Sequence, residues 1–384
     1  MSVLLQTKEV GKTKIAVGMD LHKKTAVCYA VYAGEGEPNE KKKEFLEDFN
    51  RNHRTQGSDP EDMACIAAAL RGHDTHILIE NSTKTYETYW VLTNLGCNVT
   101  VAQAQDLHNI TMSVKKTDKN DSIELAAYMR RRLNGEREFA ECTMPPKAWM
   151  MRREICRAVF SEKLHLADLK RRTKAHMLLH GIKLSREYSD IFSKKAVEEL
   201  RGTKDPCLLI FVSEARSIKS RTDEEAKLIE QMFDGLEIYH LIKSIPGFGK
   251  VSAAYLASLI MDIGRFKTSN EFTAYFGVVP KMRQSAGSSP RCATTHRGDE
   301  AARRLLCQAA FVHTNAAENS VVTRMYNRLR GKGVSHKEAQ VACARKLLTV
   351  VWSVLRSKRP YTDDEGLLER AAEVEEAMED DLGS

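Results

Sequence analysis

The sequence lacks any apolar run that approaches the ~20 residues a membrane-spanning helix needs. Residues 1–14 carry no apolar segment followed by a small-residue cleavage site, so no signal peptide is predicted. A hydrophobic content of 42% and a mean hydropathy of −0.42 are ordinary for a soluble protein. These absences exclude an integral membrane protein. We expect a cytoplasmic protein whose 384 residues form two or three domains.

Cysteines are present but never form a CxxC pair. Their number is odd and their spacing is irregular, which argues against a disulfide framework. We therefore expect reduced thiols that act mostly as small core residues, and we do not expect a zinc site. The nine positions are Cys28, Cys65, Cys97, Cys142, Cys156, Cys207, Cys292, Cys307 and Cys343.

The net charge of +7 understates how basic most of the chain is. Residues 363–384 contain ten acidic residues and one arginine and so contribute −9, which leaves +16 on residues 1–362. A strongly basic body favours a polyanionic partner, and nucleic acid is the commonest one. A merely solvated basic surface is the alternative. The acidic tail is expected to solvate the chain or to shield the basic surface.

Two apolar runs near the amino terminus predict paired strands of a buried sheet. Residues 14–19 lead directly into Asp20, and residues 25–32 follow after a short polar link. An aspartate in such a strand is costly unless its charge is compensated. A hydrogen-bonded turn or a metal ion would compensate it, and a simple cap at the strand end is the alternative.

Strands and helices then alternate, which predicts a largely parallel α/β sheet begun by an antiparallel pair. Asp59 and Pro60 are typical of a helix start, and a strand ends in Glu80. Ligands of such sheets gather at the carboxyl ends of strands, where both Asp20 and Glu80 lie. The predicted segments are a further strand at 42–45, a helix at 59–71, a strand at 76–80, a helix at 85–95 and a strand at 98–102.

Two more carboxylates, Asp118 and Asp121, lie at the start of a helix predicted to run to about Leu133. Their spacing of three residues places them on one helix face. Both could simply cap the helix and interact with its positive amino terminus. Four carboxylates at strand ends and on one helix face are also what a two-metal phosphoryl-transfer site needs, because Mg²⁺ prefers oxygen ligands. The neighbouring Lys115 and Lys116 could contact a nucleic-acid backbone.

A domain boundary is predicted at Met144-Pro145-Pro146, which divides residues 1–144 from a helical arm at 145–236. The arm opens with a long amphipathic helix from 147 to about 184, and further helix is predicted at 193–201 and 222–236. Its basic residues could follow phosphates or form a solvated face. The candidates for nucleic-acid binding are Arg152, Arg153, Lys170, Arg171 and Arg172.

The sharpest local signature is the Ile245-Pro246-Gly247-Phe248-Gly249-Lys250 stretch between two predicted helices. This pattern is typical of a helix-hairpin-helix, in which Gly247 and Gly249 allow a tight turn and the next helix presents amides to a phosphate. Such a contact binds DNA without reading its sequence. A purely structural hairpin is the alternative. The motif opens a predicted helical domain at 237–360, followed by a tail at 361–384 that we expect to be disordered.

In order and approximate spacing, the motifs resemble the "DEDD" transposases of bacterial insertion sequences, the IS-one-ten group, over roughly residues 14–357. The shared motifs are Gly18-Met19-Asp20, Leu78-Ile79-Glu80, Lys116 to Asp121, Ile245 to Gly249, and Gly277-Val278-Val279-Pro280 followed by Ser285.

The resemblance implies a RuvC-like RNase H fold at the amino terminus, a helical assembly arm, and a helical transposase domain that supplies a catalytic serine. It implies that Asp20, Glu80, Asp118 and Asp121 hold Mg²⁺ or Mn²⁺, and that Ser285 forms a covalent bond to a DNA phosphate. The implied partners are DNA, an element-encoded guide RNA and further copies of the chain, as a homodimer or homotetramer. The implied location is the nucleoid.

The Ser285 loop alone is a weak signal, because most loop serines are inert. The family serine is commonly followed by glycine, whereas Ser285 is followed by Ala286, and Ser288 and Ser289 are also candidates. Two other functions stay open. A metal-dependent junction nuclease would leave free DNA ends without a protein–DNA adduct, and a non-enzymatic nucleic-acid-binding protein would keep its activity without Asp20 or Glu80.

Overall fold

The computed structural model describes residues 15–34, 36–103, 118–136, 139, 141–278 and 298–362, with the backbone alone for Asp118 and Lys119. The chain divides into two compact units, Met1–Met144 and Pro145–Ser384, here called unit 1 and unit 2. Within the described ranges, no helix is long and apolar enough to cross a membrane.

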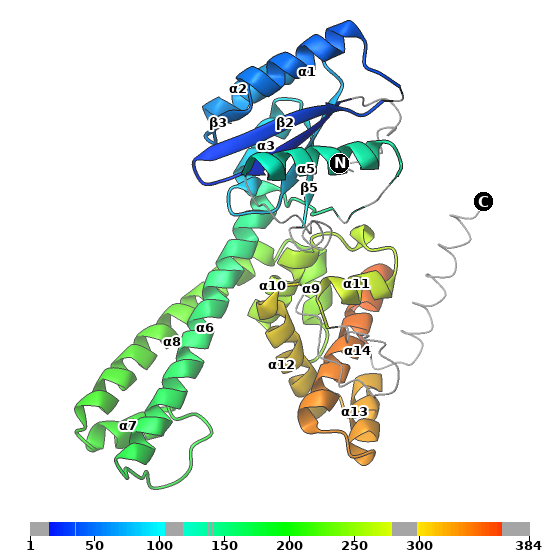
Figure 1. The fold of residues 1–384 in the computed structure, drawn as a ribbon. Coiled ribbons are helices and arrows are strands. Elements are labelled where there is room, and N and C mark those ends of the chain that lie inside the picture. The colour runs from blue at the N-terminus through cyan, green and yellow to red at the C-terminus, as the bar shows by residue number, and fades with distance from the viewer. Residues whose placement is uncertain are drawn as a thin grey trace, which may run out of the picture. The chain divides into compact units, whose positions relative to one another are not determined.

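The described part of unit 1 forms a five-stranded mixed sheet in the order β3-β2-β1-β4-β5 (Figure 1). β1 pairs antiparallel with β2, and β2 pairs antiparallel with β3. On its other side β1 is parallel to β4, and β4 is parallel to β5. The predicted antiparallel start followed by parallel strands is therefore confirmed. The strands are β1 Ile15–Leu21, β2 Thr25–Tyr32, β3 Thr55–Gly57, β4 Thr75–Glu80 and β5 Asn98–Ala102.

Helices cover both faces of this sheet because the strands are apolar on both sides. One face packs against α1 Glu40–Asn52, α2 Pro60–Leu70 and α3 Thr85–Asn94. The other packs against α5 Asp118–Leu133. Figure 1 shows α5 on the opposite side of the strands from α1 and α2. The strand predicted at 42–45 is wrong: the segment lies in α1, where the Asn39 side chain caps the helix by accepting from the Lys42 amide.

Unit 2 is helical throughout its described residues. Its long helices α6 and α8 pack side by side, and α7 packs on α8 (Figure 1). The elements are α6 Lys147–Leu179, α7 Lys194–Gly202, α8 Pro206–Phe233, α9 Glu237–Lys243, α10 Lys250–Ile260, η1 Ile263–Arg265, α11 Ser269–Tyr275, α12 Glu300–Ala316, α13 Val321–Gly331 and α14 His336–Ser357.

Two apolar cores hold this unit together. The larger one joins the start of α6 and the end of α8 to α9 through α14, with Trp352 fully buried at its centre. The smaller one lies between the carboxyl-terminal half of α6, α7 and the first half of α8, around Leu169, Leu200 and Leu208. From here on, the arm means this second region: the carboxyl-terminal half of α6, α7 and the first half of α8. It has its own core and therefore does not depend on α9 to α14 for burial of its apolar residues.

Candidate functional site

Asp20 and Glu80 lie side by side at the carboxyl ends of two parallel strands, β1 and β4. β1 and β4 are parallel, and Met19 pairs with Ile79, so the next residues of the two strands, Asp20 and Glu80, stand side by side. The neighbours Met19 and Ile79 belong to the core on the α1–α3 face. Since side chains alternate along a strand, both carboxylates point to the face covered by α5. The Asp20 side chain is 14% exposed there.

Gly18 fixes where α5 crosses this face. A Cβ atom at Gly18 would lie 2.1 Å from the Ser122 carbonyl oxygen and 2.3 Å from the Ala126 nitrogen, so only glycine lets the helix backbone approach β1 this closely. Leu133, at the other end of α5, packs in the cluster that contains Ala16. The part of α5 that begins at Ser122 therefore lies against β1 two residues before Asp20.

Asp121 belongs to that first part of α5 and is half-buried. A further acid, Glu124, lies one turn later, and its pKa is raised by burial and by the negative charge of Asp121. The sequence analysis did not single out Glu124, although its spacing of three from Asp121 was a usable signal. The backbone of Asp118 opens α5, but its side chain lies outside the described residues.

Asp20 affects the electrostatics of its surroundings. Burial, together with the charge of Asp20, raises the pKa of the Cys28 thiol to about 12. On the more exposed side, His22 Nε2 lies 3.2 Å from Asp20 Oδ2. In the part of the chain that the structure describes, one group of three or more His, Cys, Asp or Glu side chains has its ligand atoms within 4.8 Å of one another, and this group lies in unit 2. No three of the described carboxylates of unit 1 are that close to one another.

The donor set of unit 1 nevertheless suits a hard divalent cation. The side chains of Asp20, Glu80 and Asp121 offer only carboxylate oxygens, and Asp20 is largely buried. Asp20 and Glu80 lie at the carboxyl ends of β1 and β4, and Asp121 lies in the first part of α5. Mg²⁺ and Mn²⁺ are bound by such oxygen ligands rather than by thiols. The residues therefore fit the cation that the resemblance implies.

Two arginines predicted to bind nucleic acid, Arg152 and Arg153, make contacts within unit 2. Arg152 donates to the Met232 carbonyl over 3.2 Å and lies over the rings of Trp149 and Phe233. Arg153 donates to the Ser258 carbonyl over 3.2 Å, and burial lowers its pKa. Both guanidinium groups thus join α6 to other helices of unit 2. Both residues are half-buried, so their role in nucleic-acid binding stays a prediction.

The basic residues farther along α6 are more accessible. Lys170 pairs with Asp190 at 3.0 Å. Arg171 and Arg172 both pair with Asp168 at the surface, where their side chains are 75% and 64% exposed. Exposed pairs of this kind contribute little to stability and can exchange for a phosphate. Lys115 and Lys116 lie outside the described residues.

The predicted turn lies between α9 and α10. Gly247 has φ +101°, and a Cβ atom there would lie 2.3 Å from the Ala309 carbonyl oxygen of α12, so both its conformation and its packing require glycine. Gly249 precedes α10, and its amide donates to Ser252 Oγ over 2.9 Å. Lys250 and Lys243 both pair with Glu230 of α8. The turn therefore packs on other helices of unit 2, as the structural alternative expects, and its role in DNA binding stays a prediction.

Ser285 lies outside the described residues, as do Ser288 and Ser289, but the residues that flank them are well placed. Val278 is buried after α11, and the described chain resumes at Gly298. A Cβ atom at Gly298 would lie 2.6 Å from the Tyr275 carbonyl oxygen, and Gly298 has φ +85°. The described chain therefore resumes against the end of α11, and we call this position the re-entry point.

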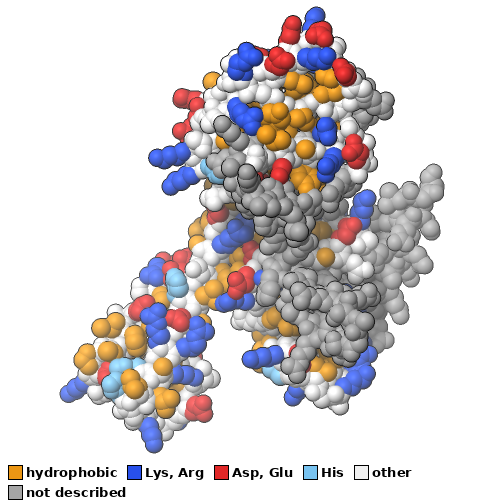
Figure 2. All heavy atoms as spheres, in the orientation of Figure 1, with side chains coloured by type: hydrophobic (Ala, Val, Ile, Leu, Met, Phe, Trp, Pro, Cys, Tyr) orange, Lys and Arg blue, Asp and Glu red, His pale blue; other side chains and the backbone are white. Residues whose placement is uncertain are grey.

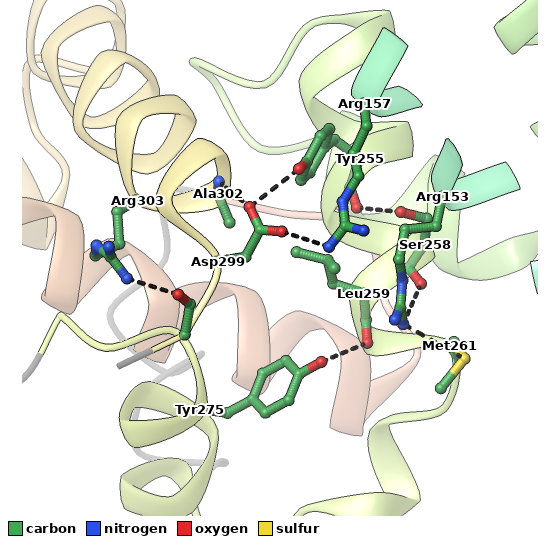
Figure 3. A network of polar contacts seen from close by, with 11 residues as sticks. Arg153, Arg157, Tyr255, Ser258, Leu259, Met261, Tyr275, Asp299, Ala302 and Arg303 are labelled. Carbon is green, nitrogen blue, oxygen red and sulfur yellow. Dashed lines mark hydrogen bonds and ion pairs between the residues drawn. The ribbon is translucent and has the colours of Figure 1, made fainter. Parts of the chain in front are cut away.

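A polar network holds the re-entry point (Figure 3). Asp299 caps α12 by accepting from the Ala302 amide over 2.9 Å. It also accepts from the Tyr255 hydroxyl of α10 over 3.0 Å and pairs with Arg157 of α6 at 2.9 Å. Arg303 donates to the Gly298 carbonyl over 3.0 Å. The sequence analysis predicted a helical domain at 237–360 but not this network, because Tyr255 and Arg157 are distant from Asp299 in sequence.

We expect Asp299→Ala to lower the free energy of unfolding of unit 2 by about 2–4 kcal/mol. A lost helix cap costs about 1 kcal/mol, and lost hydrogen bonds to a charged group cost about 1.5–3 kcal/mol. Arg157 is 49% exposed, so solvent screens its part of the loss. Urea denaturation followed through the fluorescence of Trp149 and Trp352 measures the change, and a loss below about 1 kcal/mol would show that the cap alone matters.

The matched variant Asp299→Asn keeps the cap and isolates the charge. Burial raises the pKa of Asp299, but the Ala302 amide, Arg157 and Tyr255 outweigh it and the net pKa is lowered. A lowered native pKa means that the carboxylate stabilises the fold above its unfolded pKa of about 3.9 and that this stabilisation is lost as pH falls through the native value. Wild type should therefore exceed Asp299→Asn in stability at pH 7 and lose that advantage in acid.

Comparison with known proteins finds similarity to transposases and to a gene-inverting protein. Residues 239–326, which span α9 to most of α13, match the sequence model of the "Transposase IS116/IS110/IS902 family". The matched segment contains the Gly247 turn, Asp299 with its partner Tyr255, and the stretch with Ser285.

Several relatives have similar sequences. A pilin gene-inverting protein of Moraxella bovis is 23% identical over 74% of this chain and 81% of its own length. The transposase for insertion sequence element IS1328 of Yersinia enterocolitica is 34% identical over 29% of this chain and 34% of its own length. An uncharacterized 44.8 kDa protein of insertion element IS116 from Streptomyces clavuligerus is 26% identical over 43% and 40%. The similarity to the last two thus spans well under half of their length.

Proposed function

We propose that this chain is the transposase or recombinase of an insertion sequence, and that it cuts and rejoins DNA strands through a phosphoserine at Ser285. The observation that carries the proposal is the row of Asp20 and Glu80 at the carboxyl edge of β1 and β4, facing the helix that begins with Asp118 and Asp121. The match of residues 239–326 to a transposase family supports DNA as the substrate.

The sheet order supports a RuvC-like RNase H fold for unit 1, since three antiparallel strands continue into parallel β4 and β5. Asp20, Glu80, Asp118 and Asp121 would hold Mg²⁺ or Mn²⁺, which would neutralise charge on the reacting phosphate. In the proposed step Ser285 Oγ bonds to phosphorus, the DNA P–O bond breaks, and the leaving DNA oxygen takes the proton that serine loses. The phosphoserine keeps a phosphate ester, so that a second DNA hydroxyl can displace the serine and rejoin the strands.

The carboxylates belong to unit 1, whereas Ser285 belongs to the sequence of unit 2. The proposal therefore requires closure of one unit on the other, or a second copy of the chain that supplies one half of the site. A homodimer or homotetramer follows from the second route. A guide RNA is part of the proposal through the resemblance, and the charge of +16 on residues 1–362 supports a polyanion without distinguishing RNA from DNA.

The products of the wild-type protein test the proposal. We expect that incubation with element-end DNA, RNA transcribed from the element's non-coding segment, and Mg²⁺ gives joined strands together with a protein–DNA adduct that survives denaturation. EDTA should abolish both products. Free ends without an adduct would favour the metal-dependent nuclease, and binding without any cleavage in Mg²⁺ or Mn²⁺ would favour a non-enzymatic nucleic-acid-binding protein.

A further inference from the structure

The arm brings together a set of metal-ligating side chains that has no part in the proposed reaction. His176 near the end of α6, and Asp205 and Cys207 at the start of α8, offer ligand atoms that all lie within 4.8 Å of one another. His176 Nε2 already lies 3.1 Å from Asp205 Oδ1, across 29 residues of sequence. These residues are the single such group in the described parts of the chain.

We propose that this cluster is a structural zinc site. Nitrogen, oxygen and thiolate ligands together are typical of Zn²⁺, whereas Mg²⁺ and Ca²⁺ take oxygen ligands. In a tetrahedral zinc site, bonds of about 2.0–2.3 Å place neighbouring ligand atoms roughly 3.3–3.6 Å apart. The 4.8 Å limit leaves about an ångström of closure, which is within the reach of side-chain rotation at the exposed Cys207.

In this proposal His180 is the fourth ligand and reaches the ion by rotation of its exposed side chain, because it lies outside the group of three in the structure. It follows His176 by four residues at the end of α6, and the two rings lie 4.4 Å apart between centroids. Two histidines at this spacing on one helix face are a known way to hold one zinc ion. Figure 2 shows histidine side chains beside hydrophobic ones at the far end of the arm.

The surroundings already hold the cluster in place. The Leu208 amide donates to Asp205 Oδ1 over 2.9 Å, and the Asp205 amide donates to Thr203 Oγ1. The Phe211 ring packs edge-on against His176. Contacts of this kind behind the ligands orient them for a metal. The sequence analysis dismissed zinc because no CxxC pair exists; a site with one cysteine and ligands from two helices leaves no such pattern.

Binding has a balanced chemistry and a structural consequence. Zn²⁺ replaces the proton on Cys207 Sγ and takes a lone pair of each neutral imidazole, so one proton is released per ion. The ion would join the end of α6 to the start of α8 and enclose α7, stabilising the core around Leu169 and Leu208. This inference is independent of the reaction proposed for the carboxylates.

Metal titration of the full-length, chelator-treated chain tests the site. With Mg²⁺ in excess to occupy carboxylate sites, we expect one Co²⁺ per chain with a near-ultraviolet thiolate charge-transfer band, and displacement of that Co²⁺ by Zn²⁺. Cys207→Ser should abolish the band, and His176→Ala or His180→Ala should weaken Zn²⁺ affinity by at least about tenfold.

Two variants separate metal binding from fold. Asp205→Asn keeps an acceptor for the helix cap, so its loss of Zn²⁺ affinity reports the ligand rather than helix stability. Cys65→Ser removes another exposed thiol, in unit 1, and should change nothing. A Co²⁺ spectrum without a thiolate band, or a band that survives Cys207→Ser and disappears in Cys65→Ser, would overturn the proposal.

Discussion

Replacing Asp20 with asparagine should reduce strand transfer by at least about a thousandfold, because such a loss corresponds to about 4 kcal/mol and a catalytic metal contributes several. Asparagine has nearly the size of aspartate and can still hydrogen-bond to His22, but it removes the charge that a divalent cation needs. The substitution should leave the fold intact, because Asp20 lies at the end of β1 and makes no contribution to the apolar clusters on either face of the sheet.

A matched control lies just before the amino-terminal end of β4, at the opposite end of this strand from Glu80. Asp74 directly precedes β4 and is exposed, so Asp74→Asn removes one negative charge from unit 1 far along the strand direction from Asp20. Strand transfer by this variant should equal that of wild type. RNA and DNA affinities should be unchanged in both variants. Full activity of Asp20→Asn would remove the metal site from the mechanism and leave the aspartate as a strand-end cap.

The sheet could be predicted from sequence because the residues that indicate each strand are close to one another in the sequence. The continuous apolar runs of β1 and β4 and the carboxylates near the ends of these strands are visible within a few positions of one another. The α2 helix follows in the same way from Asp59, Pro60 and the apolar residues behind them. The position of α5 on the sheet could not be predicted in this way. It depends on the close approach of Gly18 to the backbone of a helix about a hundred residues later in the sequence.

The features that the sequence analysis missed also depend on contacts between residues that are distant in sequence. Residues 206–221 of α8 were not predicted as helix, because Gly202 and Pro206 indicate a break between the helices predicted at 193–201 and 222–236. Asp205 caps this helix, Pro206 occupies its first turn, and packing on α6 decides the outcome. The contacts of Asp299 and the cluster at His176 likewise join distant segments, so neither could be read from spacing.

Ser285→Ala should eliminate the covalent protein–DNA adduct and strand transfer while DNA binding survives. The hydroxyl oxygen is the atom that would bond to phosphorus, and alanine removes it without adding bulk or charge. The flanking residues support such a mild substitution, because Gly298 and Asp299 hold the re-entering chain by contacts to Tyr275, Tyr255 and α12 that do not involve Ser285. The adduct is measured after denaturation of protein incubated with RNA, nicked element-end DNA and Mg²⁺.

Ser288→Ala and Ser289→Ala are the controls, since they remove the same atom three and four residues further along the same segment. Both should form the adduct at the wild-type level. An adduct that persists in Ser285→Ala but disappears in one of these variants would move the nucleophile to that serine and leave the reaction class unchanged. If all three variants and the wild-type protein cleave DNA without any adduct, water is the nucleophile. The phosphoserine route would have to form a covalent protein–DNA bond before it released a strand. That outcome would make the carboxylates of unit 1 the centre of a hydrolytic nuclease.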